Sequence, residues 1–243
     1  MMEHIEYGTK RIEYNVKRSK RKKTVAINVT QAAQVAVLAP NHLSRRQIKG
    51  IVTKKAQWIF EKQEYFKRLI ALFPEKEFVS GEQILFLGRK YRLKIRKVQN
   101  KCSSGPDLTG RRIFISINHH LSSEERKEII KDALIKWYFS KSVRIIRQRV
   151  NRYSELLAVI PREIAIKDQK KRWGSCSSNG ILRFNWRIAM APISIIDYIV
   201  VHELCHLKAK NHSSDFWRLV SLALPDYQRR RDWLKDNAAA FRL

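Results

Sequence analysis

VVHELCHLKAKNHSSDFW, residues 200–217, is the stretch from which the fold class and the expected chemistry follow most directly. Within it, HELCH at 202–206 places two histidines four residues apart, and on a helix such positions lie one above the other on the same face. Two imidazoles arranged in this way can bind one Zn²⁺ ion. Glu203 then lies beside the metal, where it can take a proton from a water molecule on the metal. The spacing predicts His202 and His206 as metal ligands and Glu203 as the catalytic base.

The residues before this motif weigh against a chance match on an exposed helix. The stretch ISIIDYIVV at 193–201 is rich in isoleucine and valine and predicts a largely buried helix. Two histidines and a glutamate on such a helix are costly without a partner, because unpaired buried polar groups are penalised. A metal ion supplies that partner, whereas a purely structural histidine pair is the competing explanation.

A catalytic zinc site normally has three protein ligands and one open position. No glutamate follows Glu203, which excludes a third ligand of that type from a downstream helix. His212 lies six residues beyond His206, a distance that lets the chain leave the helix, turn and return to the metal. We predict His212 as the third ligand. Asp215 is the alternative, although it could instead help to cap the helix expected near residue 216.

Directly upstream, KRWGSCSSNGILRFNW at 171–186 has the pattern of a β-hairpin whose turn contains Ser-Asn-Gly at 178–180. A strand at the edge of a zinc site can hold an extended peptide by backbone pairing. The competing interpretation is that the aromatic residues of this hairpin are simply core. The candidate substrate-binding residues are Trp173, Gly174, Ser175 and Asn185. The candidates for stabilising a tetrahedral oxyanion are Asn185, Arg187 and Tyr227.

Farther from the motif, the sequence predicts an α+β protein with a strand-rich first half. Strand-length apolar runs occupy the first 40 residues and recur at 84–98 and 111–118. One long helix is expected over 43–70 with Ser44 as N-cap, and another from Ser122, which forms a capping box with Glu125. We place a domain boundary near residue 120, giving a strand-rich region with one long helix at 1–120 and a catalytic domain at 121–243.

With these motifs in view, the chain resembles the YgjP-type family of bacterial metal-dependent hydrolases, which is related to the SprT-like and WLM-type zinc peptidases. The resemblance is most specific from about residue 170 to 217, over the hairpin and the histidine segment quoted above. It is looser in the first half, through VKRSKRKKTVAINV, VLAP and KAQWI. It implies a zincin-like fold and zinc peptidase activity with one Zn²⁺ ion, and it leaves the substrate undefined beyond a peptide or protein.

Composition bounds the compartment and the partners. The three cysteines are too few and too scattered for a disulfide framework, and Cys176 is the one cysteine that could serve as a fourth ligand of a structural zinc site. No apolar run reaches the ~20 residues of a membrane span, and the N-terminus has no apolar leader segment. We therefore expect a cytoplasmic protein without membrane contact.

The net charge of +28 arises from 50 Lys and Arg against 22 Asp and Glu, and it is spread along the whole chain. Such a field attracts polyanions, although for any one basic run a solvated surface is the simpler explanation. The densest run is KRSKRKK at 17–23. We expect DNA or RNA binding without sequence preference, with proteins on nucleic acid as potential substrates. The alternative to an enzyme is a basic nucleic-acid-binding protein with a structural zinc.

Overall fold

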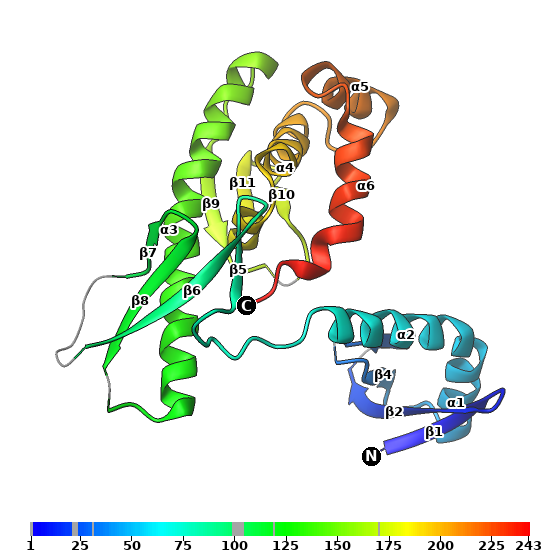
Figure 1. The fold of residues 1–243 in the computed structure, drawn as a ribbon. Helices are drawn as coiled ribbons and strands as arrows, with labels where there is room; N and C mark the ends of the chain where they lie inside the picture. Colours follow the sequence, from blue (N-terminus) through cyan, green and yellow to red (C-terminus); the bar gives the residue numbers. More distant parts are fainter. Residues whose placement is uncertain (1, 21–23, 31, 99–104, 119, 170) are drawn as a thin grey trace. The chain divides into compact units, whose positions relative to one another are not determined.

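The computed structural model describes residues 2–20, 24–30, 32–98, 105–118, 120–169 and 171–243. The chain divides into two compact units, Met1–Glu75 and Lys76–Leu243. Each unit has its own cluster of buried apolar residues. Both units combine sheet and helix (Figure 1), which confirms the predicted α+β class with a strand-rich first half.

The first unit is a four-stranded sheet packed against two helices. Its strands are β1 (Met2–Tyr7), β2 (Lys10–Ser19), β3 (Ala26–Val29) and β4 (Val35–Pro40), in the order β1-β2-β4-β3 with only β2 and β4 parallel. Alternate residues of the strands are buried, as expected for a sheet with one covered face. The core includes Ile12, Tyr14 and Val37 from the sheet and Ile48 and Ile59 from the helices.

Two helices replace the single helix expected over 43–70. They are α1 (Arg45–Lys54) and α2 (Ala56–Leu72), and the helical conformation is interrupted at Lys55. The predicted N-cap is confirmed, since the Ser44 hydroxyl accepts a hydrogen bond from the backbone of Gln47. Both halves carry apolar residues at helical spacing, so the pattern continues across the break and conceals it.

The second unit is built around α3 (Ser123–Leu157), a helix of 35 residues. The predicted capping box of Ser122 and Glu125 is confirmed. Its buried residues recur every three or four positions, and they pack against the sheet of β5 (Gln83–Phe86), β6 (Arg89–Val98), β8 (Arg112–Asn118) and β7 (Asp107–Thr109), named in spatial order. In β8 the buried residues alternate, as in a strand with one face on a core.

A second sheet and the helices that follow it in the chain complete the described part of this unit (Figure 1). The sheet has the order β10 (Gly174–Cys176), β11 (Ile181–Asn185), β9 (Glu163–Lys167), so that β10 lies at an edge. The predicted hairpin at 171–186 is therefore confirmed, apart from the terminal residues that do not pair. Helix α4 (Ile193–Cys205) contacts α3, β10, α5 (Ser214–Ala223) and α6 (Tyr227–Asn237).

The division between the units lies after residue 75 and not near residue 120. Strands β5 to β8 belong with the C-terminal unit, because their buried residues join the same apolar cluster as α3 and α4. The change from strands to a helix at residue 120 marks a boundary between elements, which a sequence pattern does not distinguish from a boundary between cores. Among the helices described, none combines the length and hydropathy that a membrane span requires.

Candidate metal centre

Helix α4 is the most deeply buried helix segment around the candidate site. Every residue from 195 to 205 is buried except His202, which is half-buried and opens onto a pocket. The helix is tied to α3 by an ion pair, in which the Arg149 guanidinium donates to the Asp197 carboxylate at 2.5 and 2.7 Å. The apolar run that predicted burial therefore also fixes the position of the motif that follows it.

Three histidines converge at the C-terminal end of this helix. His202 and His206 come from consecutive turns, and His212 returns to them after the loop over residues 207–211. One ring nitrogen from each lies within 4.8 Å of the other two, and the Nε2 atoms of His202 and His212 are 3.1 Å apart. In a tetrahedral site with bonds of ~2.0–2.1 Å, neighbouring ligand nitrogens are about 3.3 Å apart. The three side chains thus form a group that could hold one metal ion.

The state of the imidazoles also suits a metal ion. Burial, followed by the nearby His206 and His212, lowers the pKa of His202 to about 3, and burial lowers the pKa of His206. Both rings are therefore neutral near pH 7, as ligation requires. The His206 Nδ1 lies 3.0 Å from the carbonyl oxygen of Ala209, which it can donate to, leaving Nε2 free. The Nδ1 of His202 is buried without a hydrogen-bond partner among the described groups.

One aromatic side chain holds the three rings together. Phe216 of α5 is completely buried, and its ring centroid lies 4.5 Å from that of His206, 4.8 Å from that of His212 and 4.9 Å from that of His202. Sequence reasoning treated this residue only as the start of a helix. Its role depends on a contact between helices, and the nearest signal in the sequence is its position four residues after His212.

Glu203 lies beside the histidines with its carboxylate held by β10. The residue is 6 % exposed, and its carboxylate accepts a hydrogen bond from the backbone N–H of Cys176. Gly174 leaves the space that this carboxylate occupies, because a Cβ placed there would come within 2.6 Å of Glu203 Oε1. The edge strand and the carboxylate are therefore fitted to each other.

The environment tunes the acidity of this carboxyl group. Burial raises the pKa of Glu203 to about 7, while the Arg172 charge and the Cys176 N–H act in the opposite direction. A group that exchanges protons near neutral pH is suited to act as both base and acid. Neither Arg172 nor the Cys176 amide was among the predicted functional residues, since both reach Glu203 only through the packing of β10 on α4.

A pocket of about 610 Å³ runs along β10 to the histidines. Its lining consists of Arg172, Gly174, Ser175, Cys176, Ser177, Ser178, Gly180, His202, Glu203, His206, Leu207, Lys210 and His212. The backbone N–H of Asn185 donates to the carbonyl of Trp173, and the backbone N–H of Ser177 donates to the carbonyl of Ile181. Trp173 and Ser177 therefore direct these backbone groups towards β11. By the alternation of an antiparallel ladder, the backbone groups of Gly174 and Cys176 face the other, open side.

Two of the four predicted substrate-binding residues lie in this pocket and two do not. Gly174 and Ser175 line it. Trp173 instead packs against Phe241, with ring centroids 5.5 Å apart. Asn185 is 2 % exposed, and its side-chain amide donates to backbone carbonyls of the loop before β10. The aromatic ring is thus used for packing, and the asparagine supports the loop instead of contacting the pocket.

The pocket lining does not include Arg187, Tyr227 or Asp215. Arg187 forms an ion pair with Asp168, and Tyr227 stacks on Trp217 with centroids 5.2 Å apart. Asp215 is exposed, and its carboxylate lies 3.5 Å from an arginine one turn along α5. Among the described residues, the group that could hold a metal ion contains His212 and not Asp215. Cys176 lines the pocket but is not part of that group.

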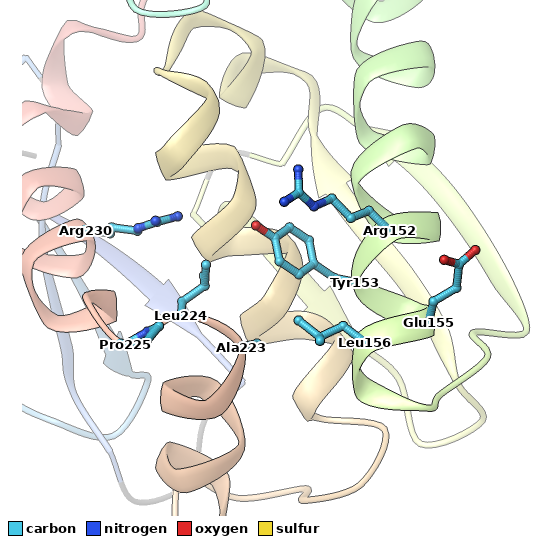
Figure 2. Close-up of a pocket in the computed structure, with 8 residues that line it drawn as sticks. All are labelled: Arg152, Tyr153, Glu155, Leu156, Ala223, Leu224, Pro225 and Arg230. Atoms are coloured by element: carbon cyan, nitrogen blue, oxygen red, sulfur yellow. The ribbon is translucent and has the colours of Figure 1, made fainter.

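A second pocket, of about 540 Å³, lies away from the histidines between the end of α3 and the connection from α5 to α6 (Figure 2). Arg152 and Tyr153 line it from α3, and Leu224 and Arg230 line it from the other side. Arg230 already donates to Asp226 and to the Ser194 carbonyl. The three histidines and Glu203 line the pocket along β10 and not this one.

Comparison with known proteins identifies the family of the chain. The profile of the family described as YgjP-like, metallopeptidase domain, matches residues 23–237. A search of curated proteins found no match. The chain is 24% identical to the metallopeptidase zymogen abylysin of Pyrococcus abyssi, over 37% of this chain and 92% of that one, with a TM-score of 0.36. It is 24% identical to the zymogen jannalysin of Methanocaldococcus jannaschii, over 38% and 96%, with a TM-score of 0.35. Since the profile covers most of its length, the chain belongs to the family of YgjP-like metallopeptidase domains.

Proposed function

We propose that this metallopeptidase is a zinc peptidase in which His202, His206 and His212 hold one Zn²⁺ ion and Glu203 is the catalytic base. The observation that carries the proposal is the convergence of three imidazoles within 4.8 Å, in the same pocket as a buried carboxylate. Imidazole donors suit zinc, and three protein ligands leave a position for substrate. When bound, the metal would polarise a water molecule and the substrate carbonyl.

The side chains of the protein divide the remaining work. Glu203 accepts the proton of the attacking water and passes it to the leaving amine. The Cys176 N–H holds this carboxylate in one orientation, and Gly174 leaves room for it. The Ala209 carbonyl orients the ring of His206.

The edge of β10 is the proposed binding surface for the substrate backbone. An extended peptide that adds to this edge would pair with the open backbone groups of Gly174 and with the carbonyl of Cys176. This pairing recognises the main chain, so it supports peptide hydrolysis in general and selects little by itself. The pocket lining next to it is where side chains of the substrate would be distinguished.

The decisive test compares the wild-type protein with Glu203→Gln in metal content and in digestion of a mixed peptide library. Glu203→Gln removes the base and keeps all three histidines, so we expect one zinc per chain in both proteins and a loss of hydrolysis in the variant on the order of 10²-fold or more. Near wild-type turnover by Glu203→Gln would show that another group handles the proton.

We also propose that the first unit binds nucleic acid without sequence preference, which would bring the peptidase to proteins on DNA or RNA. Between Glu13 and Glu61 the chain has eleven Lys and Arg residues and no Asp or Glu, six of them at 17–23 and five at 45–55. Residues 21–23 of the first group lie outside the described structure. On α1, Arg45, Arg46, Lys49 and Lys54 are exposed. Arg45 lies 3.8 Å from a carboxylate oxygen of Glu3, and the excess of cations that remains in this stretch favours a polyanion.

This second proposal is tested by titrating duplex DNA at several salt concentrations. The logarithm of the affinity should fall with the logarithm of salt by roughly 0.9 per phosphate neutralised. Changing Arg46, Lys49 and Lys54 to Gln together should flatten that slope, whereas three matched changes at exposed basic residues of the second unit, such as Lys136, should alter it less. An affinity that does not depend on salt would contradict this proposal, and the positive charge would then serve solubility alone.

A further inference from the structure

We infer that the pocket selects peptide segments with acidic side chains beside the scissile bond, through Arg172 and Lys210. This inference rests on the proposed peptidase function and adds the substrate class to it. Among the residues that line the pocket, Arg172 and Lys210 are basic and Glu203 is the one acidic residue. Glu203 is buried at the base of the site, whereas both basic residues are exposed at its surface.

Neither cation forms an ion pair among the described residues, and the acidic group on which Arg172 acts is the Glu203 carboxyl at the base of the pocket. Within the described part of the chain, no carboxylate lies within ion-pair distance of either side chain. The acidic residues nearest to them in the sequence have partners of their own, since Asp168 pairs with Arg187 and Asp215 lies 3.5 Å from Arg218. The charges of Arg172 and Lys210 therefore remain available to a ligand.

The rest of the lining contributes hydroxyl groups that an acidic side chain could use. They belong to Ser175 and Ser178. A carboxylate in this pocket would therefore find hydroxyl donors beside the two cations.

The position of Arg172 relates the preference to the scissile bond. Gly174 lies against Glu203, and Arg172 precedes it by two residues. Arg172 itself lies outside β10, which begins at Gly174, and its charge is close enough to lower the pKa of the Glu203 carboxyl. An acidic residue beside the scissile bond would thus meet Arg172. Lys210 lies on the loop between His206 and His212, at the metal side of the same pocket.

The test measures binding and cleavage separately. Two fluorescein-labelled decapeptides would have the same sequence except for four Glu or four Gln residues around the centre. Their binding to zinc-loaded Glu203→Gln is followed by anisotropy, so that selectivity is measured without turnover. Exposed ion pairs support a preference of about three- to tenfold for the Glu peptide, and it should shrink as salt rises.

Charge reversal identifies the residues responsible. Adding Arg172→Glu to Glu203→Gln should abolish or invert the preference for the Glu peptide. Adding Lys210→Glu to Glu203→Gln should reduce this preference. The matched control is Arg147→Glu, which makes the same charge change at an exposed residue of α3 outside the pocket. Equal binding of both peptides, or an equal effect of the Arg147 and Arg172 changes, would overturn the inference.

Cleavage of the two peptides by the wild-type protein then tests the proposed peptidase function separately from the binding preference. If the Glu peptide binds preferentially and neither peptide is cut, the selectivity stands and the peptidase proposal fails. If both peptides are cut at the same rate and bound equally, the peptidase proposal stands and the selectivity is overturned.

Discussion

Replacing Gly174 with alanine should inactivate the enzyme without removing its metal. The backbone at Gly174 has a φ outside the left-handed region, so an alanine adopts it without backbone strain. The added Cβ, however, would lie 2.6 Å from Oε1, 2.7 Å from Cγ and 2.8 Å from Cδ of Glu203. Three close contacts to one carboxylate mean that the side chain of Glu203 has to move as a whole.

The size of that movement sets the expected loss. Ordinary contacts of a Cβ begin at 3.4 Å, so the carboxylate must retreat by about 0.8 Å from its position beside the histidines. A displacement of about 1 Å in a reacting group can cost on the order of 10²-fold in rate. We therefore expect kcat/KM of Gly174→Ala to fall by about 10²-fold, equivalent to about 2.7 kcal/mol of transition-state stabilisation.

The assay is steady-state hydrolysis of a library-derived peptide, with zinc content and thermal unfolding measured on the same samples. The matched control is Gly50→Ala in α1, where no atom lies within 4 Å of the new Cβ. It should leave activity unchanged and stabilise the first unit by about 0.5–1 kcal/mol, because alanine replaces glycine inside a helix. Activity of folded, zinc-loaded Gly174→Ala within threefold of wild type would refute the reasoning.

Other consequences concern the third ligand, the helix that carries the motif and acid stability. His212→Ala should lower zinc affinity strongly while Asp215→Ala leaves it unchanged; the reverse result in equilibrium dialysis would exchange their roles. Asp197→Ala leaves the half-buried Arg149 without its ion-pair partner and should cost about 1–3 kcal/mol in denaturant unfolding, and a loss well under 1 kcal/mol would contradict this. In the metal-free protein, His202, with its pKa lowered to about 3, makes stability fall as pH drops below 6.5, whereas Glu203, with its pKa raised to about 7, makes stability rise as pH drops from 7 to 4.5. Metal-free Glu203→Gln should therefore lose stability between pH 6.5 and 4.5 with a slope of up to about 1.4 kcal/mol per pH unit, where the wild-type slope is smaller; equal slopes would argue against opposed titrations.

Local chemistry by itself determined the elements and the group of histidines. The spacing of His202 and His206 is a property of one helix, and the capping residues Ser44 and Ser122 act within their own turns, so a pattern of neighbours suffices to predict them. His212 is close enough in the chain that few alternatives compete with it. The hairpin of β10 and β11 was likewise predictable from its turn residues.

Only the tertiary structure decided which groups surround Glu203 and where one core ends. The Cys176 amide, the space at Gly174 and the ring of Phe216 reach the site from β10 and α5, and their roles depend on the packing of these elements against α4. Asn185 was a candidate for substrate binding because its side chain is polar. In the structure this side chain is buried, and its amide donates to a backbone carbonyl. The division after residue 75 likewise reflects which strands share a core with α3. Such contacts join residues that are distant in sequence, and a pattern of residues adjacent in the sequence does not predict them.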